Sequence, residues 1–195
     1  MKEPLLYKIV RPIIRFIMKY IFRAKYKGLE NIPLSGKLVL AGNHTNNLDC
    51  LLIISSTKRT VHFLAKDSLM KGPQKIIFKN MGIIPVDRKI HDSNALRNAK
   101  ETLKEDRVIG IFPEGTINRT KNIIMPFKIG SVKMAYDTNC YIIPFVITGK
   151  YKLFSKDLEI EFLPPYKPIS NNEDLTEANQ KLMKIIENKL KEKRN

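Results

Sequence analysis

Short apolar runs, each stopped by a polar turn, alternate along this chain with segments of helical periodicity. The runs predicted to be strands are Lys37–Ala41, Val61–Ala65, Ile83–Val86, Val108–Phe112, Tyr141–Thr148 and Leu158–Phe162. The segments predicted to be helices are Leu51–Ser56, Gln74–Asn80, Ser93–Glu105, Phe127–Tyr136 and Asn179–Leu190. This alternation predicts an α/β fold with a mixed, largely parallel sheet flanked by helices. Pro144 places its strand at an edge of the sheet or gives it a bulge.

The length of 195 residues suits one domain with a sizeable core. We expect a single α/β domain over residues 28–195, preceded by a helical segment over residues 1–27. Cys50 and Cys140 lie among apolar neighbours and make neither a disulfide framework nor a zinc site, which indicates a reduced, cytoplasmic setting. No cofactor and no metal are expected, because the histidines and cysteines lack the spacing of metal ligands.

The formal net charge of +16 requires an anionic partner or surface. Nucleic acid, anionic lipid headgroups and an acidic carrier protein are the three classes that would fit. Nucleic acid is disfavoured, because the chain has no Trp, no glycine-rich aromatic motif of an RNA-binding sheet and no zinc-finger spacing. An anionic membrane surface and an acidic carrier protein remain as partners.

Residues 5–22 form an amphipathic segment with many cations. Lys8, Arg11, Arg15 and Lys19 recur at helical spacing. The apolar face comprises Leu5, Leu6, Ile9, Val10, Ile13, Ile14, Ile17, Tyr20 and Ile21. Four cations within one short stretch argue against a transmembrane span, so we expect this segment to lie in the membrane interface. The alternative is a helix packed on the core with a solvated basic face. Pro12 is expected to kink the segment or divide it into two short helices.

The stretch Ala41–Cys50 is the densest group of polar side chains between two apolar runs. An apolar run stops at Gly42, and His44 and Asp49 precede the next run. Within one helix these two residues would lie roughly 140° apart around the axis and could not meet. If His44 lies in a turn and Asp49 in the first helical turn, the imidazole folds back over the carboxylate, giving a base with its orienting partner. Taken alone, the same pattern also fits a simple helix start capped by Asn47.

Two further polar turns follow predicted strands. Asp87-Arg88 follows one strand, and Glu114–Arg119 follows another. In sheets of this class ligands bind beyond the carboxyl ends of the strands. We therefore expect these turns and the turn that carries His44 to converge on one site.

Four sequence blocks in order make the chain resemble the glycerolipid acyltransferase family. The first, Asn-His-x4-Asp, is matched by Asn43, His44 and Asp49. The second, Gly-x-Ile-x-x-Asp-Arg, is matched from Gly82 to Arg88, and the third, Phe-Pro-Glu-Gly-Thr, from Phe112 to Thr116. The fourth is the apolar strand interrupted by Pro144. Together the blocks span roughly residues 28–150 and are far more specific than a lone His-x4-Asp.

The resemblance implies transfer of a fatty acyl group from the thioester of coenzyme A or acyl carrier protein. Its acceptor would be the sn-2 hydroxyl of the lysophospholipid 1-acyl-glycerol 3-phosphate, giving phosphatidic acid. A hydroxyl is a poor nucleophile at neutral pH, so His44 is the expected general base and Asp49 its orienting partner. The resemblance further implies substrate-binding residues: Asn43, Arg88, Glu114, Gly115 and Thr116. Cys50 is expected to be a buried helix residue rather than a nucleophile.

One position departs from the family pattern. The third block commonly continues Arg-Ser-Arg, whereas this chain has Ile117-Asn118-Arg119. The missing charge would come from Arg119, Lys121, Arg88 or Lys128, or the acceptor carries its anionic group elsewhere.

Two alternatives to phosphatidic acid synthesis stay open. In the first, the acceptor is glycerol 3-phosphate or another lysolipid. In the second, the chain is a lipid-binding protein without catalysis; the presence of His44, Asp49 and Glu114 argues against this second alternative. In the leading hypothesis the protein is peripheral or monotopic on the cytoplasmic face of the cell membrane.

Overall fold

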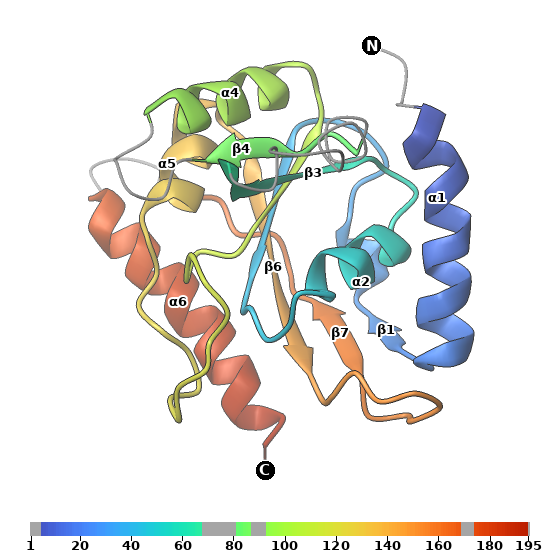
Figure 1. Cartoon of the computed structure of the whole chain (residues 1–195). Coiled ribbons are helices and arrows are strands. Elements are labelled where there is room, and N and C mark those ends of the chain that lie inside the picture. Colours follow the sequence, from blue (N-terminus) through green and yellow to red (C-terminus); the bar gives the residue numbers. More distant parts are fainter. Residues whose placement is uncertain (1–4, 68–80, 87–92, 169–173, 195) are drawn as a thin grey trace.

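The computed structural model describes residues 5–67, 81–86, 93–168 and 174–194 (Figure 1). The strands are β1 (Lys25–Lys27), β2 (Leu38–Gly42), β3 (Val61–Lys66), β4 (Ile84–Val86), β5 (Val108–Ile111), β6 (Tyr141–Thr148) and β7 (Glu159–Phe162). The helices are α1 (Leu5–Phe16), α2 (Asp49–Ser56), α4 (Ser93–Lys104), α5 (Gly130–Asp137) and α6 (Leu175–Glu192), with a π-helical turn Ile17–Ile21 and a 3-10 turn Leu29–Asn31. The predicted helix Gln74–Asn80 lies outside the described residues.

Within the described residues, seven strands form one sheet in the order β1-β7-β6-β2-β5-β3-β4. Every pair is parallel except β6 with β7, which is antiparallel. The predicted α/β fold with a mixed, largely parallel sheet is therefore confirmed. Parallel neighbours end at the same edge of a sheet, so the turns that follow β2, β5 and β6 lie close together.

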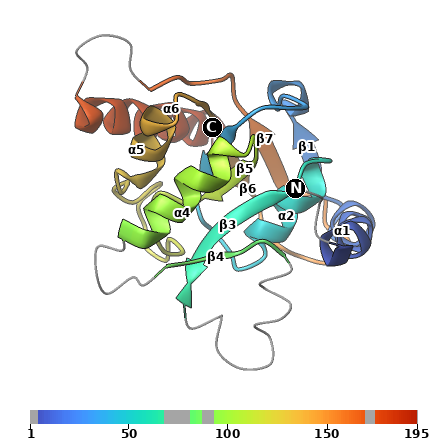
Figure 2. The same cartoon turned by 90° about the horizontal axis from the view of Figure 1, so that it is seen from above.

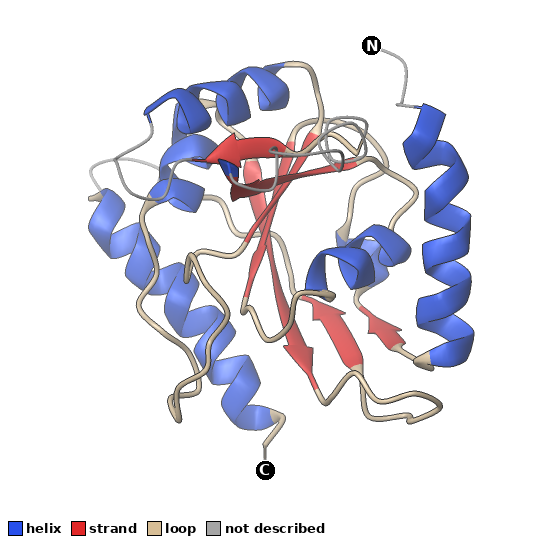
Figure 3. Cartoon of the chain, viewed as in Figure 1, coloured by secondary structure: helices blue, strands red, loops and turns tan. Residues whose placement is uncertain are grey.

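Helices cover both faces of this sheet (Figures 2 and 3). One face carries α1 and α2, and the other carries α4, α5 and α6. Strand β2 shows why two layers are needed: Leu38 and Leu40 join the core under α1 and α2, whereas Val39 and Ala41 join the core under the other helices. Side chains of a strand alternate between its two faces, and here both faces are buried.

Several element boundaries differ from the prediction. Helix α5 begins at Gly130 rather than near Phe127, because the N–H of Lys128 donates to Pro113 O at 2.8 Å and holds the preceding residues in a loop. Helix α6 is longer than predicted and buries Ala178, Leu182, Ile186 and Leu190, one every fourth residue. Strand β1 was not predicted; it is only three residues long and pairs with β7 at the edge of the sheet.

The prediction that Pro144 lies at an edge or bulge was wrong, since β6 is an interior strand between β7 and β2. The C=O of Pro144 accepts from Leu163 N at 2.8 Å. Because the N and C=O of one strand residue point to the same side, the missing N–H also faces Leu163. Leu163 is just past Phe162, the last residue of β7, so no ladder bond to β2 is lost.

The N-terminal helical segment has one apolar side that is buried and another that is exposed. Tyr7 and Ile14 of α1, with Met18 of the following π-helical turn, are buried in the core beside α2. On the far side Ile9, Ile13 and Phe16 of α1 and Tyr20 of the turn are 55 to 59 % exposed, and we call these four residues the apolar stripe. Lys8, Arg15 and Lys19 are exposed next to it. The predicted single wide apolar face is thus two faces, one buried and one exposed.

Two details of the N-terminal segment correct the prediction. Arg11 does not join the basic side of α1, because its guanidinium donates to Lys58 O near the end of α2. The helix is also not divided at Pro12, which is exposed together with Lys8. Pro12 has no N–H to donate to the C=O of Lys8, and water can form this hydrogen bond instead. Within the described residues, no helix has the length and apolar character that crossing a membrane requires.

Candidate active site

The turn between β2 and α2 brings His44 and Asp49 together. His44 Nδ1 lies 2.9 Å from Asp49 Oδ2, so the contact predicted across the turn is confirmed. Asp49 is the first residue of α2, and the preceding residue, Leu48, makes no side-chain cap. Asn47 therefore does not cap the helix, and Asp49 itself organises the turn.

The Asp49 carboxylate is fully buried but surrounded by donors. Its partners besides His44 are Thr45 N at 2.6 Å, Thr45 Oγ1 at 3.0 Å, Asn46 N at 2.9 Å and Tyr151 OH at 2.6 Å. A buried carboxylate without such partners would cost several kcal/mol, about the penalty of an unpaired buried charge. The donors hold Asp49 in one orientation, and Asp49 in turn orients the His44 ring.

The other side of the His44 ring is held by stacking. The ring lies parallel to that of Phe112, with 4.0 Å between centroids and 10° between planes. Among the residues that the structure describes, none hydrogen-bonds His44 Nε2. With Nδ1 engaged by Asp49, Nε2 is the nitrogen that can accept a proton from a substrate.

The Glu114 side chain connects the loop after β5 to the turn that carries His44. Its Oε1 accepts from His44 N at 2.9 Å, and its Oε2 accepts from Met125 N at 2.9 Å. Gly115 follows with φ of +75°, and a Cβ there would lie 2.8 Å from Lys128 Cε. Glycine adopts this backbone angle without strain and leaves room for Lys128. Both Glu114 oxygens face protein N–H groups, so this carboxylate shapes the loop beneath His44.

Burial changes the pKa of two further groups near the dyad. It raises the pKa of Glu114, although the N–H groups of His44 and Met125 act in the opposite direction. Burial, with the neighbouring charge of Asp49, raises the pKa of Cys50 to about 12. Cys50 is therefore a neutral thiol in α2, as predicted, and not a thiolate nucleophile.

Replacing Glu114 by glutamine is expected to lower the free energy of unfolding by about 2 kcal/mol, because one acceptor oxygen becomes an NH₂ group that faces a backbone N–H. Chemical denaturation measures this change. Glu101→Gln, an exposed carboxylate paired with Lys104, is the matched control and should leave the midpoint unchanged. Equal midpoints for the two variants would contradict the role assigned to Glu114.

A cavity of about 320 Å³ opens beside His44 at the carboxyl ends of β2, β5 and β6. Its lining residues are Asn43, His44, Thr45, Glu114, Asn118, Thr120, Asn122, Ile123, Ile147, Thr148, Gly149, Leu190, Lys193 and Arg194. The amide of Asn43 is buried and bonds both backbone groups of Ile147, at 2.9 and 2.8 Å. Asn43 thereby fixes the end of β2 against β6 at the wall of this cavity.

Three of the cations proposed from the sequence, Arg119, Lys121 and Lys128, do not line this cavity. These three residues are exposed, as is Thr116. Arg88 lies outside the described residues, as does Asp87.

Two cations that directly follow α6 do line the cavity, and no local motif indicated them. Lys193 is paired with Glu159 at 2.5 Å and Glu161 at 2.6 Å, whereas the Arg194 guanidinium has no bond to another described residue. Phe112 and Tyr151 were also missed as parts of the site. Tyr151 follows the carboxyl end of β6, so the rule that located the other site turns could have found it.

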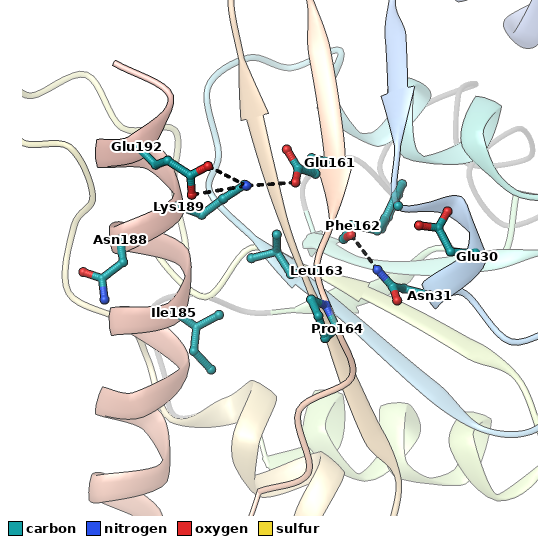
Figure 4. Close-up of a pocket in the computed structure, with 11 residues that line it drawn as sticks. Glu30, Asn31, Glu161, Phe162, Leu163, Pro164, Ile185, Asn188, Lys189 and Glu192 are labelled. Atoms are coloured by element: carbon teal, nitrogen blue, oxygen red, sulfur yellow. Dashed lines mark hydrogen bonds and ion pairs between the residues drawn. The ribbon is translucent and has the colours of Figure 1, made fainter. Parts of the chain in front are cut away.

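A second cavity, of about 460 Å³, lies between α6 and the end of β7 (Figure 4). The Lys189 side chain forms ion pairs with Glu161 at 3.0 Å and with Glu192 at 3.1 Å. Asn31 closes the other side by donating to Phe162 O at 2.9 Å. Lys189, Glu161 and Glu192 are paired with one another, which marks a packing groove rather than a reactive site.

The chain's similarity to known proteins agrees with this geometry. The family model described as Acyltransferase matches residues 23–148, which contain the dyad, Glu114 and β6. The chain belongs to this family. The resemblance drawn from the sequence blocks is thereby confirmed.

Curated relatives and a solved structure extend the comparison. A 1-acyl-sn-glycerol-3-phosphate acyltransferase of Borreliella burgdorferi is 37% identical over 134 residues, 67% of this chain and 53% of the relative. One of Bacillus subtilis is 26% identical over 95% of this chain and 98% of its own length. The match thus spans about half of the first relative and nearly all of the second. The crystal structure of the 1-acyl-sn-glycerophosphate acyltransferase PlsC from Thermotoga maritima shares the fold, with a TM-score of 0.77 at 24% identity over 96% of this chain and 81% of that one.

Proposed function

We propose that this protein transfers a fatty acyl group from a thioester to the sn-2 hydroxyl of 1-acyl-glycerol 3-phosphate, giving phosphatidic acid. The observation that carries the proposal is the His44–Asp49 pair at the cavity, with Nδ1 bound to the carboxylate and Nε2 left for a substrate. Membership of the acyltransferase family and the names of the two curated relatives support the acyl-transfer chemistry.

The reaction needs no covalent intermediate on the protein. His44 Nε2 takes the proton of the acceptor hydroxyl as its oxygen attacks the thioester carbonyl. Asp49 stabilises the imidazolium that forms. The attack forms the new C–O bond and a tetrahedral intermediate. This intermediate collapses as its C=O bond re-forms and its C–S bond breaks, and the proton passes from His44 to the departing sulfur. Acyl-CoA and acyl carrier protein both supply such a thioester, and the basic surface suits the phosphates of one and the acidic surface of the other.

The acceptor is a lipid, and the apolar stripe of α1 and the π-helical turn supplies a docking surface for its membrane. Leu153 and Phe154, in the loop between β6 and β7, are 58 and 66 % exposed. Phe154 N donates to Ile21 O at 2.6 Å, which holds this loop against the end of the N-terminal helical segment. Apolar side chains flanked by lysines and arginines suit the anionic cytoplasmic face of a membrane. In this arrangement acceptor lipid enters from the bilayer and the acyl donor from solvent.

The cavity also supplies a cation for the acceptor headgroup in place of the arginine absent at position 117. Arg194 lines the cavity and its guanidinium has no ion pair with another described residue. A guanidinium matches the forked geometry of a phosphate. An acceptor with an anionic headgroup is therefore favoured over one with a neutral or zwitterionic headgroup.

Thiol release from acyl-CoA and acyl carrier protein, measured across a panel of acceptors, tests this function. The panel contains 1-acyl-glycerol 3-phosphate, glycerol 3-phosphate, lysophosphatidylcholine and a control without acceptor. We expect rapid release with the first and a product acylated at sn-2. Faster release with another acceptor would transfer the assignment to that substrate, and equal release with and without acceptors would overturn acyl transfer.

A further inference from the structure

We propose that Tyr151 is a positioning residue for the dyad, which acts on His44 by holding Asp49. Tyr151 lies 102 positions from Asp49 in the sequence, in the loop that follows β6. Its hydroxyl donates to Asp49 Oδ1 at 2.6 Å. It belongs to none of the four sequence blocks that identify the family.

The two oxygens of Asp49 have different partners. Oδ2 receives His44 Nδ1 and the backbone N–H groups of Thr45 and Asn46, all from the same turn. Oδ1 receives Thr45 Oγ1 and Tyr151 OH. Tyr151 is thus the only one of these donors that comes from outside the His44 turn. It can resist rotation of the carboxylate when that turn moves, because its own position is set elsewhere.

The position of Tyr151 is set by contacts with the end of the N-terminal helical segment. Its ring packs edge-on against Phe22, with 5.9 Å between centroids. Phe22 follows the π-helical turn of the N-terminal segment, and Phe154 of the same loop is bonded to Ile21 O. The hydrogen bond from Tyr151 to Asp49 therefore connects Asp49 to the loop that carries the exposed residues Leu153 and Phe154.

Tyr151 acts as a donor throughout the working pH range. Burial, followed by the charge of Asp49, raises the pKa of Tyr151 above its ordinary value, so its hydroxyl keeps its proton. The other titratable groups around the pair are His44, Cys50 of α2, Tyr26 of β1 and Glu114 of the loop after β5. Burial also raises the pKa of Tyr26 and Cys50.

Loss of the tyrosine hydroxyl changes rate and pH dependence in a defined way. With one donor fewer, Asp49 is held less firmly and more of its charge acts on the imidazolium. Tyr151→Phe keeps the ring and its contact with Phe22. We expect kcat to fall about tenfold, as for the loss of one hydrogen bond to a charged group, with the acceptor KM unchanged. The acid limb of the pH–rate profile should move to higher pH.

Tyr26→Phe is the matched control, because the Tyr26 hydroxyl is also half-buried and makes one hydrogen bond, to Ser55 Oγ at 2.8 Å. We expect it to lower the melting temperature without changing kcat or the acid limb. In an Asp49→Asn background, Tyr151→Phe should cause no further loss of residual activity, because its effect passes through the carboxylate.

Two results would overturn the inference: Tyr151→Phe behaves like Tyr26→Phe, or it lowers kcat by the same factor with and without the Asp49 carboxylate. The inference rests on the proposed acyl transfer, and the two can fail separately. Full activity in His44→Ala would remove the proposed mechanism itself. An inactive His44→Ala together with an unshifted pH profile in Tyr151→Phe would remove only the role of Tyr151.

Discussion

Replacing His44 by alanine is expected to lower kcat about a hundred- to ten-thousandfold, the usual contribution of a general base. In the proposed mechanism the imidazole takes the acceptor proton, and no other histidine shares its cavity among the residues that the structure describes. The KM for the acyl donor should change little, because the thioester does not depend on Nε2 for binding. Steady-state thiol release with 1-acyl-glycerol 3-phosphate measures both constants.

A second histidine provides the control for that substitution. His62 lies in β3, where its Nδ1 is bonded to Gly82 O at 2.9 Å and burial lowers its pKa. It is an ordinary buried strand histidine. His62→Asn keeps an amide donor near the position of Nδ1 for Gly82 and should leave kcat unchanged. If both variants retained full activity, His44 could not be the base.

The second large effect expected is a loss of vesicle binding when serine replaces all four residues of the apolar stripe. Each of these side chains is more than half exposed, so the fold does not depend on them. Burying each one in lipid contributes about 1 kcal/mol, and their joint removal should weaken vesicle binding about a thousandfold. Sedimentation with anionic vesicles measures this change.

Substitution is a sharper test than removal of residues 1–24. Truncation would take Tyr7, Ile14 and Met18 out of the core and lower stability as well as binding. The control variant carries serine at Leu34 and Tyr136, which are 88 and 51 % exposed on other elements. It should bind vesicles as the native chain does. Unchanged binding by the stripe variant would show that α1 does not dock on the membrane.

The alternation of apolar runs and helical segments was sufficient to predict the class of the sheet. Each strand signal is local, since a short apolar run ends at Gly, Pro or a polar turn. The order of the strands is not local, because it depends on which hydrophobic faces pack against each other. Pro144 illustrates the difference. Its missing N–H suggested an edge strand, yet the strand is interior, because that N–H would face Leu163 just past the end of β7 and no ladder hydrogen bond is lost.

Helix α1 shows the same limit for its surface. The 3.6-residue period identified an amphipathic helix, but it could not say which apolar residues meet α2 and which meet solvent. Contact with α2 and the sheet decides this by burying Tyr7, Ile14 and Met18. The apolar residues of the segment that this packing leaves exposed form the apolar stripe.

For the site itself, the sequence alone determined the His44–Asp49 contact, because five residues and one turn are enough to close it. It also determined that Glu114 belongs with them, since parallel strands bring the turns after β2 and β5 to one edge. Only the tertiary structure decided that Tyr151 holds Asp49 and that Lys193 and Arg194 reach the cavity. Those residues come from a loop and a helix far along the chain, and their positions result from packing on the finished sheet rather than from any local pattern.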